Sequence, residues 1–124
     1  MMGAGGVARL ALIVRGQPWQ HRAARADLDL ALAAAAMDFG LEVYFLGGAL
    51  MQLAADRDSE AALLPPGYRA WAALPELAEA RFYAEREWLD RCADAAIELI
   101  LPASPLSVDQ MQAGWRRCRH VLVV

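Results

Sequence analysis

The stretch Arg81-Phe82-Tyr83-Ala84-Glu85, which leads directly into Arg86, predicts a short strand that runs straight into a helix. In an open parallel sheet, binding and catalytic groups gather beyond the carboxyl ends of the strands. The predicted strand end carries Tyr83, Glu85 and Arg86, without Cys, Ser, His or a glycine-rich loop. A phenol therefore stands where a small α/β enzyme would carry its nucleophile. This pattern favours a partner subunit over an independent catalyst.

Apolar runs typical of strands alternate with helical periodicity on both sides of this stretch. Strands are predicted, in chain order, at residues 7–14, 41–46, 80–84, 96–101 (stopped by Pro102) and 120–124, the last of them buried. Helices are predicted at residues 21–38, 49–55, 86–94 and 108–118, with a surface loop and one or two helical turns between residues 56 and 79. Alternation of this kind predicts an α/β fold with a parallel sheet and helices on both faces.

The composition is that of one domain with surplus apolar surface. The 124 residues fit a single domain over 1–124, with residues 1–6 as a flexible tail. Hydrophobic residues make up 58% of the chain, above the usual share of roughly 45–50%. Burial against another subunit explains this excess, but so does genomic base composition, because all 12 basic residues are Arg.

Several classes of protein are disfavoured. A net charge of −3 argues against nucleic-acid binding, which usually needs a basic face. The longest run without charge, Val43 to Ala55, has 13 residues, whereas a bilayer requires roughly 20. The start of the sequence has no basic region of the kind that opens a signal peptide. We therefore expect a cytoplasmic protein without a membrane span.

The cysteines and glycines each allow two interpretations. Cys92 and Cys118 are too few for a disulfide framework and lack metal-ligand spacing, so no metal or cofactor is expected. Cys92 falls inside a predicted helix, where a packing role is favoured over a reactive thiol. Gly47-Gly48 stands between a strand and a helix, where backbone N–H groups can receive an anion, although a tight turn is favoured.

An ordered set of segments resembles a known family. The set comprises the Pro18-Trp19 turn, the helix at 27–37, the segment at 43–53 with its Gly47-Gly48 turn, Tyr68-Arg69, the run at 82–89 and the ending at 120–124. It is similar to the small sulfur-relay proteins of the DsrE/DsrF/TusC/TusD group, and within it to the DsrF/TusC branch. The resemblance implies a three-layer α/β/α fold around a five-stranded, mainly parallel sheet, and assembly into heteromers of related subunits.

The resemblance also implies a role. In this group, the DsrE/TusD-type subunit carries a cysteine at the end of the third strand, and that cysteine holds a persulfide. Here the corresponding region, Tyr83 to Arg86, has no thiol, and Gln20-His21 replaces the small residues that relatives commonly show. A phenol cannot form a persulfide, because that chemistry needs a thiolate.

We therefore expect a non-catalytic or accessory subunit of a DsrEFH/TusBCD-like complex, with DsrE/TusD-like and DsrH/TusB-like partners. Two alternatives remain open: a sulfurtransferase that uses Cys92, and a homo-oligomeric domain that binds a small ligand. The residues expected to line the family cleft, which would also hold the small ligand, are Trp19, His21, Gly47, Gly48, Tyr83 and Arg86.

Overall fold

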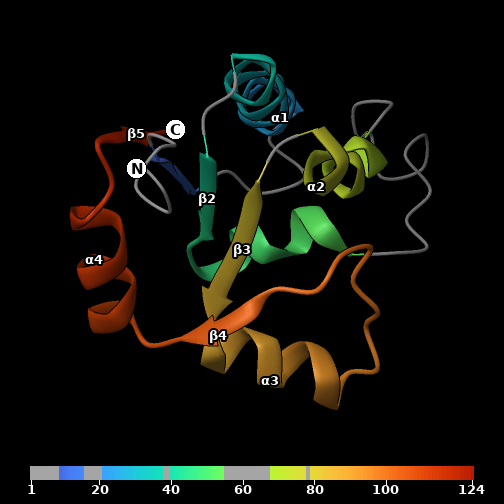
Figure 1. Ribbon diagram of the computed structural model, residues 1–124. Helices are drawn as coiled ribbons and strands as arrows, with labels where there is room; N and C mark the ends of the chain where they lie inside the picture. The colour runs from blue at the N-terminus through green and yellow to red at the C-terminus, as the bar shows by residue number, and fades with distance from the viewer. Residues whose placement is uncertain (1–8, 16–20, 38–39, 55–67, 78) are drawn as a thin grey trace.

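A parallel sheet with helices on both faces forms the fold (Figure 1). The computed structural model describes residues 9–15, 21–37, 40–54, 68–77 and 79–124. The strands are β1 (Arg9–Val14), β2 (Gly40–Phe45), β3 (Ala80–Glu85), β4 (Ser104–Leu106) and β5 (His120–Val123). The α-helices are α1 (His21–Ala36), α2 (Leu74–Leu77), α3 (Arg86–Asp94) and α4 (Val108–Arg116), and two 3₁₀ helices are η1 (Gly47–Leu53) and η2 (Tyr68–Ala73).

All neighbouring strands in the sheet are parallel. Their order is β4-β3-β2-β1-β5, which confirms the expected α/β fold with five parallel strands. The register places Tyr83 of β3 beside Tyr44 of β2. Because side chains alternate between the two faces of a strand, residues paired in this way point to the same face.

One face of the sheet carries most of the core. Alternate residues such as Leu12, Phe45 and Phe82 pack there with α1, η1 and Trp71 of η2. The rings of Phe45 and Trp71 pack edge to face, with their centroids 5.4 Å apart. The other face packs Ala11, Tyr44 and the partly buried Tyr83 against Met111 of α4. Figure 1 shows α1 and α2 on one side of the sheet and α4 on the other, so the architecture has three layers.

The expected strand at residues 96–101 is wrong. Ala96 adopts a positive φ of 55°, and Leu99 forms only an isolated antiparallel bridge with Ala54. The N–H of Ile100 donates to the carbonyl of Leu53 at 2.7 Å. This apolar run packs against the core as a connection, and the fourth strand, β4, begins after Pro102. Pro105 is tolerated within it because β4 lies at the edge of the sheet.

The final strand is not buried, contrary to expectation. All four residues of β5 are exposed, with Val123 at 55%. The reason is its position: among the described strands, β5 pairs with β1 alone and forms the second edge of the sheet. The short helix expected at 49–55 is the 3₁₀ helix η1. Residues 1–6, the expected tail, lie outside the described residues. No described helix has the length and apolar character to cross a membrane.

Candidate functional site

A hydrogen bond to the Glu85 carboxylate links the carboxyl ends of β2 and β3. Gly47 follows β2 with a φ of +52°, a left-handed conformation that favours glycine. Its N–H donates to the side chain of Glu85, the last residue of β3. A β-carbon at Gly47 would lie 3.7 Å from Nε1 of Trp88, which is ordinary contact, so the backbone angle sets the need for glycine.

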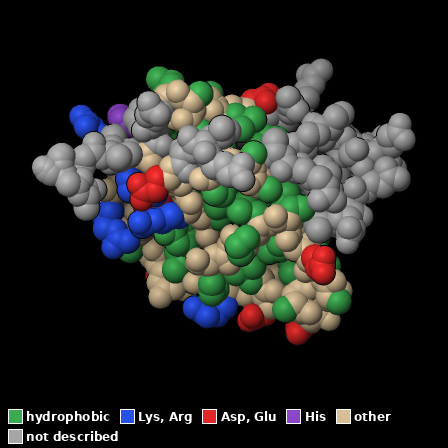
Figure 2. Space-filling model, turned by 45° about the vertical axis from the view of Figure 1, so that its right-hand side comes forward, with side chains coloured by type: hydrophobic (Ala, Val, Ile, Leu, Met, Phe, Trp, Pro, Cys, Tyr) green, Lys and Arg blue, Asp and Glu red, His purple; other side chains and the backbone are tan. Residues whose placement is uncertain are grey.

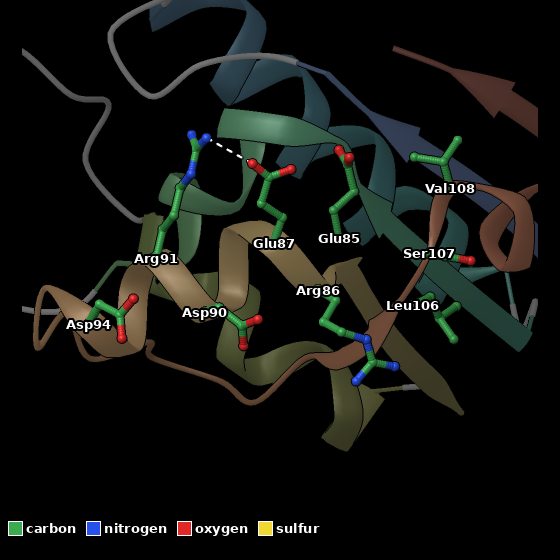
Figure 3. Close-up of a pocket in the computed structure, with 9 residues that line it drawn as sticks. All are labelled: Glu85, Arg86, Glu87, Asp90, Arg91, Asp94, Leu106, Ser107 and Val108. Carbon is green, nitrogen blue, oxygen red and sulfur yellow. Dashed lines mark hydrogen bonds and ion pairs between the residues drawn. The ribbon is translucent and has the colours of Figure 1, made fainter.

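An open pocket of about 580 Å³ lies beside this junction (Figure 3). Its charged lining comes from the end of β3 and from α3, as Glu85, Arg86, Glu87, Asp90, Arg91 and Asp94. Leu106, Ser107 and Val108 supply the wall opposite α3, where β4 passes into α4. Ser107 holds this wall in place, because its hydroxyl accepts from the N–H of Gln110 while the Gln110 side chain accepts from the N–H of Ser107.

Carboxylates outnumber cations in this pocket. Four acidic residues face two arginines. Arg91 is already engaged, because it pairs with Glu87 at 2.9 Å and lies over the ring of Trp88 at 4.9 Å. Among the described residues, no three His, Cys, Asp or Glu side chains are arranged to hold a metal ion.

Neither of the two thiols in the chain lines this pocket. Cys92 is 4% exposed within the main core, and burial raises the pKa of its thiol. Cys118 lies on the opposite face of the sheet, next to Glu42. Burial and then the Glu42 carboxylate raise the pKa of Cys118 to about 11. Both thiols are therefore protonated at neutral pH, whereas a sulfur nucleophile must be a thiolate.

The structure separates the residues expected to line one site. Arg86 is the first residue of α3 and lines the pocket. Gly47 contacts the pocket indirectly, because its N–H donates to Glu85, which lines the pocket. Gly48 is buried in η1. Tyr83 lies within β3 rather than at its end, and its ring stacks on that of Tyr44 at 5.0 Å, on the α4 face. Trp19 lies outside the described residues, and His21 is described only as the first residue of α1.

The sequence interpretation missed most of the acidic lining. Glu87, Asp90 and Asp94 recur on α3 at intervals of three and four residues, a spacing that places side chains on one side of a helix. That signal was available from the sequence. The opposite wall, at Leu106 to Val108, was not predicted, because the fourth strand was expected at residues 96–101 instead of 104–106.

A polar network lies on the α4 face of the sheet. Its centre is Glu42 of β2, which accepts hydrogen bonds from Tyr44 at 2.6 Å and from Arg9 at 2.7 Å. Cys118 lies nearby, and its thiol donates to the carbonyl of Gly114 at 3.8 Å. Burial alone would raise the pKa of Glu42, but the hydrogen bonds from Tyr44 and Arg9, the charge of Arg9 and the nearby Cys118 thiol outweigh it. The pKa of Glu42 is therefore lowered.

Replacing Glu42 with Gln is expected to destabilise the fold in a pH-dependent way. A lowered pKa means that the Glu42 carboxylate stabilises the folded chain above its unfolded pKa, near 4.5, and that this stabilisation is lost as the pH falls through the folded pKa. At pH 7, urea titration should show Glu42→Gln less stable by about 1–2 kcal/mol. Glu98→Gln, at an exposed position, serves as the control. A difference between Glu42→Gln and the parent that stays constant down to pH 3 would contradict this assignment.

Comparisons with known proteins agree with this fold. The model of the DsrE/DsrF-like family matches residues 8–123. The crystal structure of the ychN protein from E. coli superposes with a TM-score of 0.74, covering 95% of this chain and 100% of that chain at 11% identity. At that identity the likeness concerns the fold alone. No curated protein matches the chain.

Proposed function

This chain belongs to the DsrE/DsrF-like family, and on that basis we propose that it is an accessory, non-catalytic subunit of a sulfur-relay assembly in the cytoplasm. Membership of the family points to a function related to sulfur relay. The finer assignment, to the DsrF/TusC branch and to a complex with DsrE/TusD-like and DsrH/TusB-like subunits, is our proposal.

One observation carries the proposal. The junction between β3 and α3 holds Glu85 and Arg86, and the Glu85 carboxylate is bound to the N–H of Gly47. A persulfide carrier needs an accessible thiolate at its site, because the thiolate attacks the sulfane sulfur. Cys92 is enclosed in the core instead, and the pKa of each thiol is raised. The alternative of a sulfurtransferase that uses Cys92 is therefore disfavoured.

Exposed apolar surface supports a role beside another subunit. Met37, Val108 and three residues of β5 are large hydrophobic side chains left exposed in the single chain. Figure 2 shows hydrophobic side chains across the middle of one face, with charged groups of both signs around them. Surfaces of this kind commonly mark contacts with other proteins.

Incubation with polysulfide tests the non-catalytic role. We expect intact-protein and peptide mass spectrometry to find no added sulfur on Cys92 or Cys118 in the folded chain. The same treatment in urea, which exposes both thiols, is the matched control and should give persulfides. A persulfide on Cys92 of the folded chain would overturn the proposal and restore the sulfurtransferase.

Native mass spectrometry tests the assembly. After co-expression with the neighbouring small α/β proteins of its genome, the chain is expected in a heteromer that includes a subunit with a cysteine at its strand end. A stable homo-oligomer that excludes such proteins would contradict the accessory role. It would favour the alternative of a homo-oligomeric domain that binds a small ligand.

A further inference from the structure

We propose that a second pocket, between α4 and the sheet, binds a small organic oxyanion, meaning a phosphate or carboxylate group attached to an apolar body. This pocket has a volume of about 380 Å³, within the range of roughly 300–1,000 Å³ that is usual for ligand sites. Its polar lining comes from β2, β3 and α4: Glu42, Tyr44, Arg81, Tyr83, Gln110 and Arg117. The inference does not depend on the sulfur-relay role.

Two arginines approach the pocket from opposite elements. Arg81 belongs to β3, and Arg117 follows the last residue of α4. A guanidinium presents several N–H donors in a planar fork that matches the oxygens of a carboxylate or phosphate. Two such groups on one pocket are therefore suited to holding an oxyanion between them.

The charges around the pocket leave these arginines available. The carboxylate of Glu42 is compensated by Arg9 at 2.7 Å. Among the described carboxylates, Arg81 contacts only Glu79, at 3.5 Å, and both side chains are more than half exposed. Glu79 is shared with Arg9 at 3.3 Å. Exposed ion pairs of this kind have a small interaction free energy, so the Arg81–Glu79 pair holds Arg81 only weakly. Within the described part of the chain, no carboxylate forms an ion pair with Arg117.

The apolar wall indicates what is attached to the anionic group. Tyr83 and Leu106 line the pocket beside Gln110 and Ala113. The ring of Tyr83 is fixed by stacking on Tyr44, which in turn meets Trp115 edge to face at 5.5 Å. A rigid aromatic wall beside two cations favours a flat or aliphatic body on the ligand, with the Gln110 amide as a further hydrogen-bonding group.

Isothermal titration calorimetry with phenyl phosphate tests the site in the full chain. We expect saturable binding of phenyl phosphate and weaker binding of inorganic phosphate. Phenol, which has the ring without the phosphate, should not saturate the protein. Arg117→Ala is expected to reduce the affinity for phenyl phosphate by about tenfold or more, because a charge-assisted contact is removed.

The matched control is Arg119→Ala, because Arg119 is exposed near the same end of α4 but does not line the pocket. It should bind phenyl phosphate as the parent does, while Arg81→Ala should weaken binding as Arg117→Ala does. Circular dichroism checks that each variant folds. Absence of saturable binding at millimolar phenyl phosphate, or equal losses in Arg117→Ala and Arg119→Ala, would overturn the proposal.

Discussion

Gly114→Ala is expected to lower the free energy of unfolding by about 3 kcal/mol, although alanine normally favours a helix. A β-carbon at Gly114 would lie 2.4 Å from Oη of Tyr44 and 3.2 Å from its Cζ. The hydroxyl has little freedom to move away, because it donates to Glu42 at 2.6 Å and the ring packs against Tyr83 and Trp115. The steric cost and the strained hydrogen bond together outweigh a propensity gain of about 1 kcal/mol.

Removing the opposing hydroxyl should rescue the variant. In a Tyr44→Phe background, Gly114→Ala is expected to cost less than about 1 kcal/mol, because only the contact with ring carbon remains. Ala113→Gly, at the neighbouring exposed position of α4, measures the propensity difference alone. Urea denaturation of the four members of the cycle provides the free energies. If the costs of Gly114→Ala and Tyr44→Phe simply add, the proposed contact is absent.

Local signals in the sequence predicted the elements around the site well. The β3–α3 junction was expected at Glu85 and Arg86, and the structure has it there. A helix was expected from residue 108, and α4 begins at Val108, where Ser107 forms a capping box with Gln110. In each case a few adjacent residues determine the outcome, so the signal is local.

The failures arose where tertiary contacts decided the structure. The apolar run at 96–101 looks like a strand, but its backbone bonds to Leu53 and its side chains pack against the core. No strand was expected at 104–106, where β4 includes Pro105, and an edge strand can accommodate proline. The exposure of β5 likewise depends on its place at the edge of the sheet, which apolar composition does not reveal.

Which residues of β3 reach the site depends on the face of the sheet to which each side chain points. Tyr83, Glu85 and Arg86 were expected together at the strand end, and β3 ends at Glu85, two residues after Tyr83. Phe82 and Ala84 enter the main core, and Tyr83 therefore faces α4. The residues at the junction of β3 and α3 are Glu85 and Arg86. Glu85 and Arg86 are therefore the two residues of the thiol-free segment, Tyr83 to Arg86, that line the pocket beside α3.

Placing a cysteine at Arg86 is expected to create sulfur uptake that the parent chain lacks. Arg86 is the first residue of a nine-residue helix, is exposed and lines the pocket beside β3. A helix N-terminus favours a thiolate by about 0.3–1 kcal/mol, although Glu85 and Glu87 oppose it. The Arg86→Cys thiolate would attack polysulfide, forming a cysteine persulfide as a shorter polysulfide leaves.

Peptide mass spectrometry after polysulfide treatment measures this gain, and Ala93→Cys is the matched control. Ala93 is exposed in the last turn of the same helix, where the helix dipole disfavours a thiolate. The helix dipole favours the thiolate at the first position and disfavours it in the last turn. Arg86→Cys should therefore be alkylated by iodoacetamide about threefold or more faster than Ala93→Cys at pH 7. Persulfide should accumulate in the same order. If the two cysteines react at equal rates, the strand end does not activate a thiol beyond exposing it to solvent. The missing cysteine would then not explain a loss of sulfur transfer in this chain.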